Sequence, residues 1–115
     1  MMSVTIYHNP RCSKSRRTLA VIQEKGLEHE IIEYLKSPPS EAELDQILIK
    51  LGIQPEVLLR KGEDEFKDYF MGKDLSRAEI IRLMVQHPKV IERPIVINGS
   101  KAIIGRPPER VLDIL

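Results

Sequence analysis

Cys12, the only cysteine of the chain, lies in a basic and polar stretch, His-Asn-Pro-Arg-Cys-Ser-Lys-Ser-Arg-Arg, at residues 8–17. A thiolate is the nucleophilic form of cysteine, and nearby cations favour it over the neutral thiol. The cations near Cys12 are Arg11, Lys14, Arg16 and Arg17. A lone cysteine among apolar neighbours is typically a buried structural residue, but these neighbours are charged or polar. The stretch therefore predicts a reactive thiolate in a loop that binds an anion.

The elements on either side of Cys12 strengthen this interpretation. Residues 4–7, Val-Thr-Ile-Tyr, are typical of a strand, and residues 13–25 are typical of an amphipathic helix with Leu19 and Ile22 on one face. Cys12 is thus expected where a strand ends and a helix begins. Unpaired backbone N–H groups and the positive end of the helix dipole favour negative charge at such a place.

The first third of the chain predicts a strand–helix–strand unit. Gly26 is suited to ending the first helix, and residues 29–34, His-Glu-Ile-Ile-Glu-Tyr, are typical of a second strand. Such a unit implies a right-handed crossover and a pair of parallel strands.

The middle of the chain, residues 35–92, has a helical pattern instead. Ser40 with Glu43 and Ser76 with Glu79 are capping boxes, each followed by an amphipathic helix. The first helix has apolar residues at helical spacing: Leu44, Ile47, Leu48 and Leu51. The second has Ile80, Leu83 and Met84 and is expected to stop at His87-Pro88. A short helical turn is expected over residues 56–59, and aromatic side chains are expected to pack the polar segment 61–74, namely Phe66, Tyr69 and Phe70.

The last segment predicts a hairpin and a closing helix. Residues 94–97 and 100–104 flank Asn98-Gly99, which suits a type I′ turn. Pro107-Pro108-Glu109 suits the first turn of a helix that buries three residues, Val111, Leu112 and either Ile114 or Leu115. The predicted order is therefore β-α-β, a helical block, then β-β-α.

The composition is ordinary for a soluble globular protein and excludes several classes. A length of 115 residues suits one domain, and a net charge of +1 argues against a nucleic-acid or acidic-membrane partner. No apolar run approaches the roughly 20 residues that span a bilayer. The start, Met1-Met2-Ser3-Val4, has no signal-peptide pattern, so a cytoplasmic location is expected. One cysteine excludes an intramolecular disulfide and a cysteine-rich zinc site, and no metal site is expected. Any thiol that resolves an oxidised Cys12 must come from another molecule.

The predicted order of elements resembles the thioredoxin–glutaredoxin fold, an α/β class. The resemblance implies one domain over residues 1–115 with a helical insertion at about 36–90. In that fold a cis proline faces the active thiol, and Pro94 would be its counterpart.

Four motifs, in order along nearly the whole chain, resemble the glutaredoxin-linked arsenate reductase family. They are His8-Asn9-Pro10-x-Cys12-x-x-x-Arg16, Arg60, Glu92-Arg93-Pro94-Ile95-Val96 and Gly105-Arg106-Pro107. The resemblance implies that Cys12 attacks arsenate held by Arg60, Arg93 and Arg106. It further implies glutathione as co-substrate, glutaredoxin as partner and no tightly bound cofactor. Guanidinium groups suit this task because they stay charged and offer paired, planar donors to an oxyanion.

The roles of several supporting residues stay open at this point. His8 either supports the thiolate or caps the loop, and Arg16 either contacts the anion or is an exposed helix residue. Lys61 is an alternative to its neighbour Arg60 as the third anion contact. Asn9 is expected to order the turn before the thiol. The other two histidines are expected to be surface or packing residues, namely His29 and His87.

Two other functions compete with arsenate reduction. The first is a redox-responsive regulatory module of a related branch that binds RNA polymerase. Many members of that branch carry Cys-x-x-Cys, whereas this chain has Cys12-Ser13-Lys14-Ser15. The second is a monothiol oxidoreductase that acts on glutathione mixed disulfides. A phosphatase-type loop does not fit, because it needs five residues between cysteine and arginine and this chain has three before Arg16.

Overall fold

The computed structural model describes residues 4–115. Met1–Ser3, on which the expectation of a missing signal peptide partly rests, lie outside the described residues. The described chain forms two compact units: the residues up to Ser37 together with Arg93–Leu115, and Pro38–Glu92. The bounds of the second unit lie two residues from those expected for the helical insertion. None of the helices in residues 4–115 is long and apolar enough to cross a membrane.

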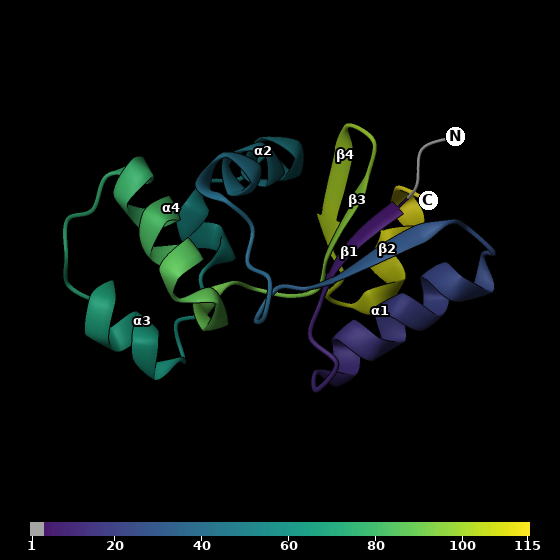
Figure 1. The fold of residues 1–115 in the computed structure, drawn as a ribbon, viewed down its shortest axis with the longest axis horizontal. Helices are drawn as coiled ribbons and strands as arrows, with labels where there is room; N and C mark the ends of the chain where they lie inside the picture. Colours follow the sequence, from purple (N-terminus) through teal and green to yellow (C-terminus); the bar gives the residue numbers. More distant parts are fainter. Residues whose placement is uncertain (1–3) are drawn as a thin grey trace. The chain divides into compact units, whose positions relative to one another are not determined.

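The first unit is built on a four-stranded mixed sheet in the order β2-β1-β3-β4 (Figure 1). Its strands are β1 (Val4–His8), β2 (His29–Glu33), β3 (Ile95–Asn98) and β4 (Lys101–Ile104). β1 runs parallel to β2 and antiparallel to β3, and β3 pairs with β4 as a hairpin. The predicted strands and the parallel crossover are confirmed.

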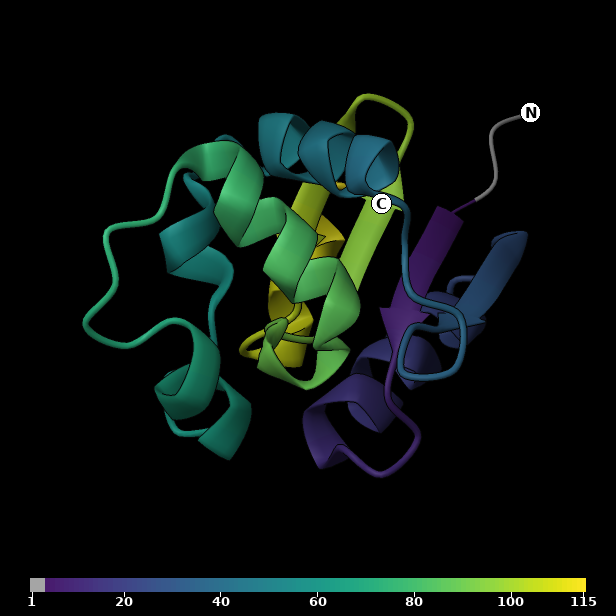
Figure 2. The same cartoon turned by 60° about the vertical axis from the view of Figure 1, so that its left-hand side comes forward.

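Two helices cover one face of this sheet (Figures 1 and 2). They are α1 (Ser13–Glu24) and the 3₁₀ helix η3 (Pro108–Asp113), which lie against each other. The core between helices and sheet consists of Val4, Ile6, Ile22, Val96 and Val111. Residues paired across antiparallel strands point to the same face, so Ile6 and its partner Val96 meet the helices together. The prediction that Leu112 is buried was wrong: a single 3₁₀ helix turns only one narrow face inward, and Leu112 is 46% exposed.

The turn of the hairpin lies one residue later than the sequence suggested. Asn98 pairs with Lys101, so the two-residue loop is Gly99-Ser100 rather than Asn98-Gly99. Among residues 4–115, positive φ is confined to four glycines, including Gly99 at 64°. Positive φ at the first loop position alone is the pattern of a type II′ turn rather than the predicted type I′. Asn98 stays in the strand, where its side-chain amide donates a hydrogen bond to the carbonyl of Ile114.

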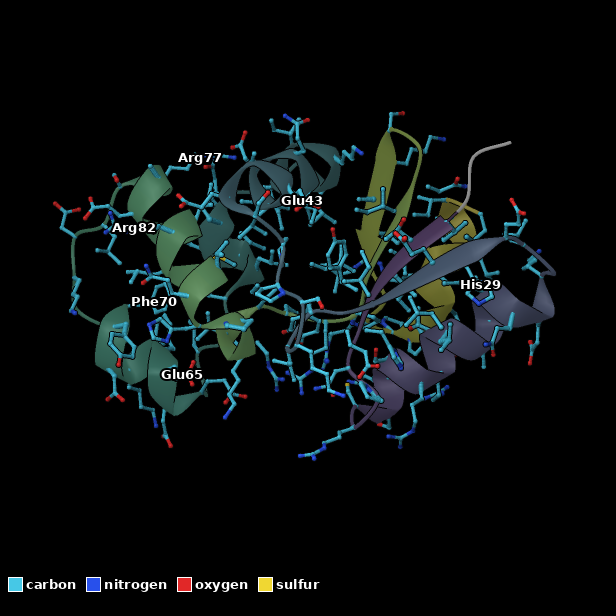
Figure 3. The ribbon with its side chains drawn as sticks, viewed as in Figure 1. His29, Glu43, Glu65, Phe70, Arg77 and Arg82 are labelled. Carbon is cyan, nitrogen blue, oxygen red and sulfur yellow. The ribbon has the colours of Figure 1, made fainter. Side chains whose placement is uncertain are left out.

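The second unit is helical, as expected. It contains α2 (Glu41–Leu51), η1 (Pro55–Leu58), α3 (Asp64–Tyr69), α4 (Arg77–Gln86) and η2 (Pro88–Val90). Both predicted capping boxes are present, and Figure 2 shows α2 lying across α4. The sequence did not predict α3. Phe70 (Figure 3), which follows α3, is buried. Its ring stacks on that of Phe66, with a centroid distance of 5.9 Å.

Candidate active site

Cys12 lies at the boundary between strand and helix that the sequence predicted. It is the N-cap residue of α1, with φ −91° and ψ 122°, and it is half-buried. Its backbone N–H donates to the carbonyl of Asn9 at 3.0 Å, and its carbonyl accepts the N–H of Arg16 at 3.0 Å. Within the described residues its side chain makes no capping hydrogen bond, and the first turn of α1 has no acidic residue. The N–H groups of that turn therefore favour an anion beside the sulfur.

Ser15 holds the loop that carries the thiol. Its hydroxyl lies 2.6 Å from Nδ1 of His8 and accepts the backbone N–H of Asn9 at 3.0 Å. Ser15 is 0% exposed and His8 is 6% exposed. The Asn9 side chain in turn accepts the N–H of Arg11 at 3.0 Å, which confirms that Asn9 orders this turn. The residues before Cys12 are thus tied to the buried face of α1.

The contacts of His8 fit a neutral imidazole that accepts a hydrogen bond from Ser15. Burial lowers the pKa of His8; the nearby carboxylate of Glu33 opposes this shift, and the charge of Arg16 adds to it. Glu33 is the partner of His8 across the β1–β2 pair. A neutral ring offers an unprotonated nitrogen, and the Ser15 hydroxyl has one hydrogen to donate. The hydrogen bond with Ser15 ties His8 to the thiol loop, and support of the thiolate by His8 stays a prediction.

The segments that carry Arg93 and Arg106 lie at the same edge of the sheet as the start of the Cys12 loop. Arg93 precedes β3 and Arg106 follows β4, and the register pairs Ile95 with Ile104. Ile95 also pairs with Tyr7, near the end of β1. Nη1 of Arg106 donates to the carbonyl of Arg93 at 3.1 Å, so the two segments are joined directly. The first unit therefore brings the thiol loop and both arginine segments to one edge of its sheet.

Pro94 is buried, and the Arg93–Pro94 peptide bond is cis, as the resemblance implied. The Arg106–Pro107 bond is also cis, which the sequence analysis did not predict. The carbonyl of Pro94 accepts the N–H of Gly105 at 2.9 Å.

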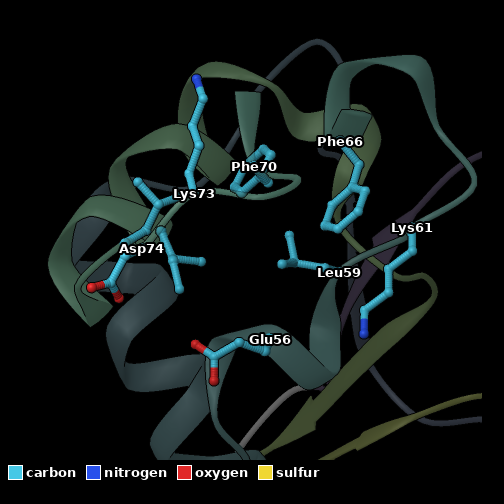
Figure 4. Close-up of a pocket in the computed structure, with 9 residues that line it drawn as sticks. Glu56, Leu59, Lys61, Phe66, Phe70, Lys73 and Asp74 are labelled. Carbon is cyan, nitrogen blue, oxygen red and sulfur yellow. The ribbon is translucent and has the colours of Figure 1, made fainter. Parts of the chain in front are cut away.

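Arg60 belongs to the second unit and is engaged there. Its backbone N–H donates to the carbonyl of Val90 at 2.7 Å. Its guanidinium lies 3.8 Å from a carboxylate oxygen of Glu63 and 3.9 Å from one of Glu92. Its neighbour Lys61 lines a cavity of about 260 Å³ in the same unit (Figure 4). The choice between these two cations as the third anion contact stays a prediction.

The other cations near the thiol are exposed. Nη1 of Arg16 donates to the carbonyl of Pro10 at 2.9 Å and so braces the thiol loop. Arg17 pairs with Glu109 at 3.1 Å across the α1–η3 contact. The anion contact expected of Arg16 stays a prediction.

The two remaining histidines do not join the thiol loop. Nδ1 of His29 lies 2.9 Å from the carbonyl of Leu27. The ring of His87 stacks on Tyr69, with a centroid distance of 4.0 Å, and its Nδ1 lies 3.5 Å from Glu65. Both act in local packing, as expected.

Three residues at this edge were not recognised from the sequence as important. Ser15 occupies a variable position of the cysteine motif, Thr18 belongs to no motif, and Gly105 belongs to the motif of Arg106 without a role of its own. Ser15 and Thr18 follow Cys12 at intervals of three, so their spacing along a helix was a signal that they share its buried face. Nothing local indicated the contact of Thr18 with Gly105, which spans 87 residues of chain.

Comparison with known proteins places this chain in a family. Residues 7–114 match the model of the ArsC family. The chain belongs to the ArsC family. It is 51% identical over 116 residues to an arsenate reductase of Haemophilus influenzae, covering 99% of this chain and 100% of that protein. It is also 47% identical to the uncharacterized protein YfgD of Escherichia coli K12, covering 97% of this chain and 96% of that protein.

A solved structure agrees with this assignment. The structure of an arsenate reductase from Vibrio cholerae has a TM-score of 0.94 and is 45% identical, covering 99% of this chain and 98% of that one. The fold is thioredoxin-like, as the order of elements indicated.

Proposed function

We propose that this protein is an arsenate reductase in which Cys12 is the nucleophile and Arg93, Arg106 and Arg60 hold the oxyanion. One observation carries the proposal: the thiol loop and the segments of Arg93 and Arg106 all lie at the same edge of the sheet. Two relatives named arsenate reductase, at 51% and 41% identity over 99% and 100% of this chain, support the choice of substrate.

The reaction begins at sulfur. The Cys12 thiolate attacks the arsenic of arsenate, an S–As bond forms, an As–O bond breaks, and the oxygen leaves as water after protonation. The N–H groups of the first turn of α1 and the arginine side chains stabilise the negative charge that develops on the remaining oxygens. A guanidinium suits this role because its planar donors match two oxyanion oxygens at once.

A second thiol must complete the reduction. Arsenic gains two electrons between arsenate and arsenite, and two thiols supply them by becoming one disulfide. Cys12 is the only cysteine of the chain, so at least one of these thiols belongs to another molecule. We assign this role to glutathione, with glutaredoxin reducing the resulting mixed disulfide, and we place the reaction in the cytoplasm. The protein itself needs no tightly bound cofactor for this sequence of steps.

Replacement of Cys12 tests the proposal directly. Cys12→Ser should reduce arsenate-dependent turnover with glutathione and glutaredoxin to background, because a hydroxyl is a far weaker nucleophile at neutral pH and no second thiol can substitute. Ser13→Ala, next to Cys12 and exposed, is the matched control and should keep its activity. Retained turnover in a folded Cys12→Ser protein would show that the mechanism is wrong.

The same assay distinguishes the mixed-disulfide oxidoreductase. A glutathione mixed disulfide offered in place of arsenate should be reduced more slowly than arsenate by the parent protein. Faster reduction of the mixed disulfide would favour the oxidoreductase. The comparison is informative because a relative at 47% identity carries no assigned activity in its name.

A further inference from the structure

Besides Ser15, Thr18 on the buried face of α1 makes a contact at the edge of the sheet where the thiol loop lies. Thr18 is 0% exposed, and its hydroxyl oxygen lies 2.8 Å from the carbonyl of Lys14 and 3.5 Å from that of Gly105. A hydroxyl has one hydrogen, and the shorter distance assigns it to Lys14. The contact between Thr18 and Gly105 is therefore mainly a van der Waals contact and not a hydrogen bond.

The fit at Gly105 leaves no room for a side chain. A Cβ atom there would lie 2.7 Å from Oγ1 and 3.1 Å from Cγ2 of Thr18, and 2.9 Å from Cγ of Pro94. Neither neighbour can swing aside, because Thr18 is buried in a helix and the proline ring is closed. A larger residue at position 105 would have to push the chain away from α1.

Gly105 lies among the contacts that set the position of Arg106. Its backbone N–H donates to the carbonyl of Pro94 at 2.9 Å. The side chain of the next residue, Arg106, donates through Nη1 to the carbonyl of Arg93 at 3.1 Å. The segment is thus held to the start of β3 by hydrogen bonds and to the thiol-bearing helix by the close contact with Thr18.

We propose that Thr18 and Gly105 are positioning residues that set the distance of Arg106 from the helix that carries Cys12, and so determine the affinity for the oxyanion. Ser15 ties the thiol loop to α1, and Thr18 seats the Arg106 segment on the same face one turn later. This inference rests on the proposed function for the identity of the anion.

Enlarging the side chain at position 105 and then shortening the one at position 18 tests the inference. Gly105→Ala should lower kcat/KM for arsenate by roughly 10²-fold, the order expected when a binding group is displaced by about 1 Å. It should also raise the arsenate concentration that protects Cys12 from iodoacetamide. Adding Thr18→Ala to Gly105→Ala removes two of the three close contacts. The double variant should regain at least a tenth of the lost kcat/KM and of the lost protection by arsenate. Gly62→Ala is the control, because a Cβ there meets none of the described residues within 4 Å.

A second pair of variants leaves Gly105 in place, in case Gly105→Ala does not fold. Thr18→Val keeps the shape and should stay within about threefold of the parent in protection by arsenate, a change of roughly 0.7 kcal/mol. Thr18→Ala alone removes the seat of the Arg106 segment and should weaken protection by more than that.

The outcomes separate this inference from the proposed function. Unchanged protection in folded Gly105→Ala, no recovery in the double variant, or equal protection in Thr18→Val and Thr18→Ala would overturn the positioning role alone. No protection of the parent protein by arsenate would overturn the proposed function and this inference together.

Discussion

The hydroxyl of Ser15 holds the thiol loop, so its removal should destabilise the protein markedly. Ser15→Ala deletes one oxygen that contacts Nδ1 of His8 at 2.6 Å and the N–H of Asn9 at 3.0 Å. The site is closed to solvent, because Ser15 is 0% exposed and His8 is 6% exposed. Water therefore cannot easily replace the lost partner.

The size of the effect follows from the two groups left behind. A buried polar group that loses its partner costs about 1–3 kcal/mol. Asn9 is only partly buried, so we expect a total loss of about 2–4 kcal/mol in the free energy of unfolding. With an unfolding entropy of about 2.1 cal/mol/K per residue over the whole chain, this corresponds to a fall of about 8–16 °C in Tm.

Urea unfolding followed by far-ultraviolet circular dichroism measures this loss, since the chain has no tryptophan. The matched control is Ser13→Ala, an exposed serine in the same helical turn. Its free energy of unfolding should stay within about 0.5 kcal/mol of the parent. The reasoning is refuted if Ser15→Ala is as stable as Ser13→Ala, because the hydroxyl would then hold nothing.

Further predictions concern the charged groups near the thiol loop, the arginines and His8. Arg93→Lys and Arg106→Lys keep the charge but lose the planar fork, so kcat/KM for arsenate should fall by about 10²–10³ in variants that remain folded. Arg60→Lys should lose less activity, and the exposed control Arg110→Lys should lose almost none. Activities of Arg93→Lys and Arg106→Lys within threefold of the parent would contradict the arginine clamp. Burial lowers the pKa of His8, so below about pH 6.5 the unfolded chain binds a proton that the folded protein resists. The free energy of unfolding should therefore fall toward acid more steeply in the parent than in His8→Gln, and parallel curves from urea titrations at several pH values would count against this role of burial.

Local patterns in the sequence were enough for the elements and for the position of the thiol. The capping boxes Ser40–Glu43 and Ser76–Glu79 connect residues three apart, so the sequence alone shows them. The same holds for Cys12, whose position before a helix depends only on its near neighbours. The motifs with their arginines likewise indicated the family, because all but the single residue Arg60 are short runs of neighbouring residues.

Tertiary structure decided what those local elements hold in place. Asn98 pairs with Lys101 at the end of β3 and its side chain bonds to Ile114, so the turn lies one residue later than the local pattern indicated. Thr18 meets Gly105 across 87 residues, a contact that depends on how a helix packs on a sheet rather than on any local preference. A sequence shows which residues are able to act, because chemistry belongs to residue types. Only packing decides which small residues, such as Ser15 and Gly105, hold them in place, because contact distances between distant segments are set by the whole fold.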